Sequence, residues 1–146
     1  MNYGRLVAAA VAATITDAVY GFLVYGMLLA SEFARTPEVF RSTEEGMAYL
    51  PFMFVGILIA MFAIVAIYAR GYEGGSGVAE GARFGALFGF VVGTLFASVD
   101  YGTLNIGRKL AAALFVAGLF EWILNGIVIG LVYKPASVAS ARKPGV

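Results

Sequence analysis

The sequence contains neither cysteine nor histidine among its 146 residues. Without a thiolate or an imidazole, the chain lacks the side chains that usually hold zinc or copper and that ligate haem iron. Ser-His and Cys-His nucleophilic pairs are excluded for the same reason, and no disulfide can join the loops. We therefore expect no metal, no cofactor and no enzymatic activity.

Charged residues are also scarce. They make up 13% of the chain, whereas a soluble domain usually carries about 25%. The formal net charge of +1 provides no basic surface for a nucleic-acid partner. Hydrophobic residues reach 61%, a composition that indicates the lipid bilayer as the main partner of the chain.

The apolar residues gather in four blocks, at about residues 6–30, 47–69, 83–104 and 110–133. Each block is long enough to cross the hydrocarbon core, which takes roughly 20 residues of helix. Backbone groups in lipid must be hydrogen-bonded internally, so these blocks are helices. The sequence predicts an all-α, polytopic membrane protein: a four-transmembrane-helix bundle over residues 1–134 and a polar tail over residues 135–146.

Two signals predict where helices begin. Ser42 and Glu45 have the spacing of a capping box just ahead of the second block. Residues 36–38, Thr-Pro-Glu, are typical of a helix start, with a cap, a proline and an acid in order. They predict a short interfacial helix that carries Val39 and Phe40.

Basic residues predict the orientation, because cytoplasmic loops carry more lysine and arginine than outer loops. Six lie on the side of the termini and four on the opposite side. This difference predicts that both termini lie in the cytoplasm. The six are Arg5, Arg70, Arg83, Lys134, Arg142 and Lys143, and the four are Arg35, Arg41, Arg108 and Lys109.

Small residues recur every four positions in the third block, at Gly81, Gly85, Gly89, Gly93 and Ala97. Positions four apart lie on one helix face, and in lipid such a face lets a second backbone approach closely. One interpretation is packing within the bundle, and the other is a homo-oligomer seam or a docking face for another subunit. Candidate partner residues are Gly118, Gly126 and Gly130 of the fourth block and Gly4, Ala8 and Ala12 of the first.

Two acids lie deep in the predicted bilayer. Asp17 comes 12 residues after Arg5, and Glu121 comes 12 residues after Lys109, so at about 1.5 Å per residue both lie near the midplane. No lysine or arginine of any block lies at that depth. An ionised carboxylate there costs at least about 2.5 kcal/mol, so we expect one or both acids to carry a proton.

Polar neighbours surround the two acids. Thr14 and Tyr20 share a helix face with Asp17, and Asn125 follows Glu121 by four positions. These residues form a candidate intramembrane cluster with two interpretations. It is either a hydrogen-bonded clasp between helices or a ligand and ion site that responds to protons or cations, or anchors a lipophilic ligand.

The second block has no charged residue in its core, and Phe52, Met53 and Phe54 predict a lipid-facing helix. Asp100 and Tyr101 are expected at the membrane interface, at the end of the third block.

Residues 68–85 read Tyr-Ala-Arg-Gly-Tyr-Glu-Gly-Gly-Ser-Gly-Val-Ala-Glu-Gly-Ala-Arg-Phe-Gly. With the acidic, proline-containing loop before the second block, this stretch resembles a family of small bacterial four-helix membrane proteins that has no established activity. The resemblance covers most of the chain and supports the topology, and it implies a multi-pass protein of the bacterial inner (plasma) membrane. Glu80 and Arg83, three positions apart, are expected to pair.

The residue types favour a non-enzymatic protein that works by helix–helix association, as an accessory or assembly subunit of a membrane complex or as a homo-oligomer. The alternative is a small transporter or channel component, or a binder of a lipophilic ligand, that uses Asp17 and Glu121. An enzyme acting on a lipid or quinone is the weakest hypothesis, because the sequence has no nucleophile or metal signature.

Overall fold

The computed structural model describes residues 1–133, and over this part of the chain every regular element is a helix. Four helical stretches within it, Tyr3–Leu28, Thr43–Arg70, Gly77–Thr103 and Arg108–Tyr133, are long and apolar enough to cross a membrane. The prediction of an all-α fold with four helices of spanning length is therefore confirmed for these residues. The predicted polar tail and Lys134 lie outside the described residues.

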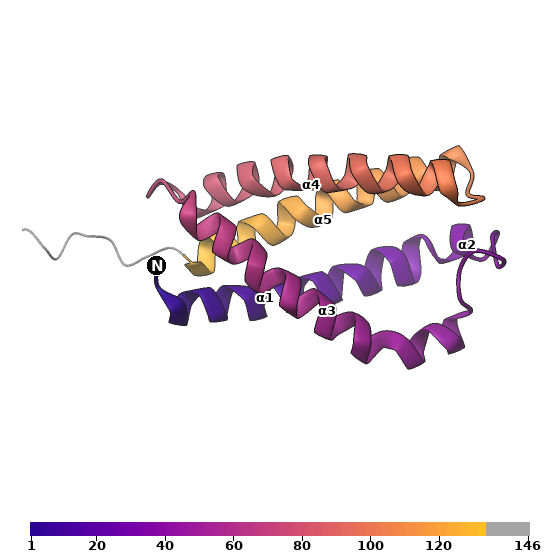
Figure 1. Cartoon of the computed structure of the whole chain (residues 1–146), viewed down its shortest axis with the longest axis horizontal. Helices are drawn as coiled ribbons and strands as arrows, with labels where there is room; N and C mark the ends of the chain where they lie inside the picture. The colour runs from indigo at the N-terminus through magenta and orange to yellow at the C-terminus, as the bar shows by residue number, and fades with distance from the viewer. Residues whose placement is uncertain (134–146) are drawn as a thin grey trace, which may run out of the picture.

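The elements, labelled in Figure 1, run back and forth between two ends. The terminal end holds Tyr3, Tyr133 and the 71–76 connection, and the loop end holds the connections at 29–42 and 104–107. In chain order the elements are α1 (Tyr3–Gly21), the π-helix η1 (Phe22–Leu28), α2 (Ala30–Phe33), α3 (Thr43–Arg70), α4 (Gly77–Thr103) and α5 (Arg108–Tyr133).

Capping side chains determine where α3 and α4 begin, and both helices start at an earlier residue than the apolar blocks indicate. The predicted capping box is present: Ser42 accepts from the Glu45 backbone N–H at 3.2 Å, and the Glu45 carboxylate accepts from the Ser42 N–H at 3.3 Å. It begins α3 at Thr43 rather than at residue 47. Ser76 caps α4 in the same way, so that α4 begins at Gly77 rather than at residue 83.

The prediction of an interfacial helix at residues 36–40 is wrong. The backbone N–H groups of Val39 and Phe40 both donate to the Thr36 carbonyl, which forms one turn and no helix. Both side chains instead pack on a small apolar cluster at the loop end that includes Ile106 and Leu110. Burial against α5 thus competes with continuation of the helix.

The glycine series is the seam between α4 and α5. Gly77, Gly81, Gly85, Gly89 and Gly93 are all buried. A β-carbon at Gly81 would collide with the carbonyl oxygen of Gly126, and one at Gly77 would collide with that of Gly130. The partner helix is therefore α5, which supplies Gly126 and Gly130. The first-helix alternatives do not contact this face, because Gly4 has only Asn2 nearby.

The main core lies in the terminal half of the bundle, where α1, α3 and α5 meet. Ala9, Ala10 and Ala13 of α1 are fully buried, and these small side chains let the neighbouring helices approach closely. α3 contributes Met61 and Val65 to the same core. The two halves of the bundle therefore differ in packing, and the loop half is the more open one.

α3 diverges from the rest of the bundle toward the loop end (Figure 1). Its buried residues, Met61 to Tyr68, all lie in the terminal half, whereas Phe52 in the loop half is 82% exposed. The expectation of a lipid-facing helix therefore applies fully to the loop half of α3. The terminal half packs one face on the core and leaves Ile59 and Ile67 exposed, and apolar residues on both faces do not reveal which face is buried.

Arg83 pairs with Glu73 rather than with Glu80. Its guanidinium lies 2.9 Å from the Glu73 carboxylate, across the 71–76 connection. Glu80 instead accepts a hydrogen bond from the Gly75 backbone N–H at 2.5 Å. The expected Glu80–Arg83 pair is thus wrong, because the nearby turn offers each side chain a different partner.

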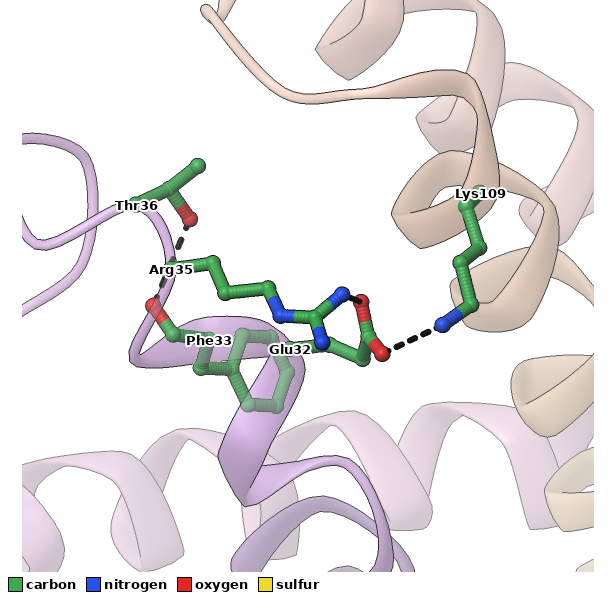
Figure 2. A network of polar contacts seen from close by, with 5 residues as sticks. All are labelled: Glu32, Phe33, Arg35, Thr36 and Lys109. Atoms are coloured by element: carbon green, nitrogen blue, oxygen red, sulfur yellow. Dashed lines mark hydrogen bonds and ion pairs between the residues drawn. The ribbon is translucent and has the colours of Figure 1, made fainter.

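An ion-pair network fixes α2 to the start of α5 at the loop end, as Figure 2 shows. The Glu32 carboxylate accepts from Lys109 at 2.6 Å and from Arg35 at 3.3 Å. The hydrogen bond from Lys109 lowers the pKa of Glu32, and Arg35 adds to this effect. A lowered pKa keeps Glu32 ionised at neutral pH, so the contribution of the network to stability is lost only as the pH falls through that lowered pKa.

Candidate functional site

The two midplane acids meet near the middle of the bundle. Asp17 is on α1 and Glu121 is on α5, and their carboxyl groups are neighbours. Two ionised carboxylates side by side repel each other, so we expect the pair to hold one proton. The structure thus brings together the pair that the depth of the two residues predicts.

Asn125 is the innermost member of the site. Its side-chain nitrogen Nδ2 donates to Asp17 Oδ1 at 3.0 Å, and the residue is 0% exposed. Its other polar atom, Oδ1, has no hydrogen-bond partner among the described residues. Most buried polar side-chain atoms have a partner, so this carbonyl oxygen is an acceptor beside the acid pair that is still available.

Two other residues that the sequence predicts for the site bond to backbone carbonyl groups and not to the acids. Tyr20 does not reach either carboxyl group, and its hydroxyl donates to the Ala117 carbonyl of α5 at 2.8 Å. Thr14 donates to the Ala10 carbonyl of its own helix at 2.9 Å. Threonine commonly makes this bond four positions back along a helix. The structure therefore places Tyr20 at the edge of the site and does not bring Thr14 into it.

Tyr25 belongs to the site, although sequence reasoning missed it. Its hydroxyl donates to Glu121 Oε2 at 2.7 Å. On a regular α-helix, at about 100° per residue, a position eight after Asp17 lies about 80° away from it. The wider i→i+5 turns of η1 reduce this angle and turn Tyr25 toward α5. The sequence gives no clear signal for such turns.

A cavity of about 230 Å³ opens beside Glu121, between η1, α4 and α5. Its wall includes the aromatic residues Tyr25, Phe96, Phe115 and Trp122. Asp100 also lines it, near the loop end of α4. Ile106 and Ala111 connect this wall to the cluster on which the 34–42 loop packs.

Glu121 therefore lies between two environments. One of its neighbours is the part-buried carboxyl group of Asp17, which does not line the cavity. Its other surroundings are the cavity and the Tyr25 hydroxyl. Of the two midplane acids, a proton or a small cation that enters the cavity meets Glu121 first and Asp17 second. This arrangement is a part-buried acid beside a cavity that extends toward the loop end.

Most small residues of α4 lie away from the acid pair and its cavity, and only those toward the loop end of the series line the cavity. Gly81, Gly85 and Gly89 are in the α4–α5 seam, whereas Gly93 and Ala97 line the cavity. Gly118, a candidate partner for the seam, lines the cavity as well. Over residues 1–133 no group of three acids or other metal-binding side chains gathers to hold a metal ion.

Comparisons with protein-family models, with curated proteins and with solved structures find no match to this chain. The four membrane-long helices within residues 1–133 agree with the small four-helix architecture that the resemblance implies. The family itself stays a prediction. Function must therefore be argued from the acid pair and its cavity.

Proposed function

We propose that the chain is a non-enzymatic component of a small transporter or channel, in which Asp17 and Glu121 bind and release a proton or a small cation. The observation that carries the proposal is the position of Glu121 between a second acid and a cavity. Ionisable residues inside a membrane are costly, and they commonly mark ion pathways and proton relays.

A purely structural clasp explains the same residues less well. A clasp satisfies the polar groups that it joins, yet Asn125 Oδ1 has no partner among the described residues. A clasp also has no need of the cavity on the far side of Glu121. Both features fit a site that takes up a charged species, because the cavity gives access to Glu121 and the amide oxygen is an unused acceptor beside Asp17.

Infrared difference spectroscopy of the purified protein tests this proposal. Raising the pH from about 5 to about 9, a range in which buried glutamates are known to titrate, should change the carboxylic-acid band of the wild type. The variant Glu121→Gln should lose that change. A wild-type band that does not respond to pH in this range contradicts the proposal.

Association with another membrane protein is the second candidate, and one observation favours it. The loop half of α3 has no buried residue, and a β-carbon at Gly56 meets no other atom within 4 Å. The glycine face of α4 is already filled by α5, whereas the loop half of α3 offers an accessory subunit or a homo-oligomer a face without a partner helix. A stoichiometric partner that copurifies from native membranes, and is lost in Gly56→Leu, would support this role over the first.

We also propose that the terminal end faces the cytoplasm of a bacterial inner membrane, and that the chain belongs to the small four-helix family that residues 68–85 resemble. The excess of basic residues at the terminal end supports this orientation. The natural absence of cysteine makes the test simple. In intact cells, a membrane-impermeant thiol reagent should label Glu38→Cys and not Glu73→Cys, and the reverse pattern would invert the topology.

A further inference from the structure

The wall of the cavity beside Glu121 has an unusual composition. Aromatic rings and two carboxyl groups line it, and no lysine or arginine of the described residues does so. Aromatic faces attract cations through their negative quadrupole, and the attraction grows when water is excluded. A wall of acids and aromatic rings therefore selects for positive charge. The residues are Tyr25, Phe96, Asp100, Phe115, Glu121 and Trp122.

The volume and the lining of the cavity restrict the size and the chemistry of the ligand further. Its volume of about 230 Å³ is below the range of roughly 300–1,000 Å³ that is common for pockets that hold drug-sized molecules. The remaining lining, which includes Val92, Ile106 and Leu114, is apolar. A fitting ligand is consequently small, with an apolar body and one positive charge.

We propose that this cavity binds a small hydrophobic organic monocation, a tertiary or quaternary ammonium, with its charge beside Glu121 and its apolar groups against the aromatic wall. The inference rests on the proposed function, since it names the class of cation that the acid pair takes from the loop end. The ammonium compound would be the cargo or the regulator of the transporter or channel component.

The charge balance at Glu121 agrees with a single positive charge. The titratable groups near Glu121 are Asp17 and Tyr20 from α1 and Tyr25 from η1, and Asp100 of α4 lies farther along the cavity. On α5 itself the polar neighbour is the neutral Asn125. With the one proton that we expect the pair to hold, Asp17 and Glu121 carry one negative charge, which a monocation neutralises. An anion would add a second negative charge in an apolar setting.

Trp122 offers a direct readout, because it lines the cavity and is the single tryptophan of the chain. The probe is benzyltrimethylammonium, titrated against the purified protein in lipid nanodiscs while tryptophan fluorescence is recorded. We expect a saturable change with the wild type. Loss of one charge-assisted contact in Glu121→Gln should weaken binding roughly tenfold to a hundredfold. Asp100→Asn, away from the acid pair, should weaken it less and still fold.

Two controls make the result decisive. Neopentylbenzene, the neutral carbon isostere of the probe, should not give the saturable change, and Glu44→Gln, an exposed acid at the start of α3, should bind the probe like the wild type. Equal binding of the neutral isostere, or no saturable change with the wild type, overturns the inference. If the infrared band still responds to pH in that case, the proposed function stands and only the ligand class is wrong. If neither assay responds, both fail.

Discussion

Replacing Gly85 with alanine is expected to destabilise the protein by about 3 kcal/mol or more, although only one methyl group is added. A β-carbon at Gly85 would collide with the carbonyl oxygen of Trp122 and would lie 2.9 Å from the Cα of Ile123. Both atoms belong to the backbone of α5, so no change of side-chain rotamer can relieve the collision. The two helices would have to separate along their length.

A matched substitution isolates the packing effect from helix propensity. Gly56, in the middle of α3, has no atom within 4 Å of an added β-carbon. Since glycine is up to about 1 kcal/mol worse than alanine inside a helix, Gly56→Ala should leave stability unchanged or raise it slightly. The same chemical change is therefore expected to have opposite signs at two positions.

Unfolding in mixed micelles, followed by far-ultraviolet circular dichroism as sodium dodecyl sulfate is added, measures both variants. Gly85→Ala should unfold at a much lower fraction of the detergent than the wild type, and Gly56→Ala should not. Equal midpoints for the two variants would contradict the close α4–α5 seam. Gly89→Ala should fall between them, because the atom nearest its β-carbon, the Trp122 Cβ at 2.7 Å, makes a less severe collision than the one at Gly85.

Sequence periodicity predicted the face of the seam but not its partner. A spacing of four places Gly81, Gly85, Gly89 and Gly93 on one side of a helix whatever the fold. Choosing α5 over α1 required knowing that Gly126 and Gly130 lie opposite them. The divergence of α3 was equally hidden, because apolar residues occupy both the positions that face the core and those that are exposed.

The sequence predicted the depth of the candidate site in the membrane, but it identified only some of the residues that form the site. Counting residues from the charged ends placed Asp17 and Glu121 at one level, and the structure brings them together. Tyr25 was missed because the turns of η1 change the angle per residue, and Thr14 was included because a regular helix places it near Asp17. The cavity depends on tertiary packing between η1, α4 and α5, which a one-dimensional pattern does not contain.

Exchanging either midplane acid for its amide is expected to separate stability from proton exchange. Asp17→Asn keeps an oxygen that can accept from Asn125, and Glu121→Gln keeps one that can accept from Tyr25. Hydrogen bonds between membrane helices are worth about 0.6 kcal/mol on average. Each variant should therefore remain folded, with an unfolding free energy within about 1 kcal/mol of the wild type.

The response to protons should change much more. In Glu121→Gln the group that faces the cavity can no longer ionise, so the pH-dependent carboxylic-acid band should disappear. In Asp17→Asn the band should persist, because Glu121 can still ionise toward the cavity. The control Glu44→Gln, exposed at the start of α3, should leave both the band and the stability unchanged.

A structural clasp predicts the opposite result: the amide variants should change the stability of the protein and not its response to protons. If the acids only join α1 to α5, both amide variants should lose stability together, and a double-mutant cycle should show that the losses are coupled. The wild type would then show no pH-dependent band for the variants to remove. Losses above about 2 kcal/mol in both variants without any change in proton exchange would identify the clasp. Loss of exchange from a folded Glu121→Gln protein would instead identify Glu121 as the residue through which protons or cations enter the acid pair.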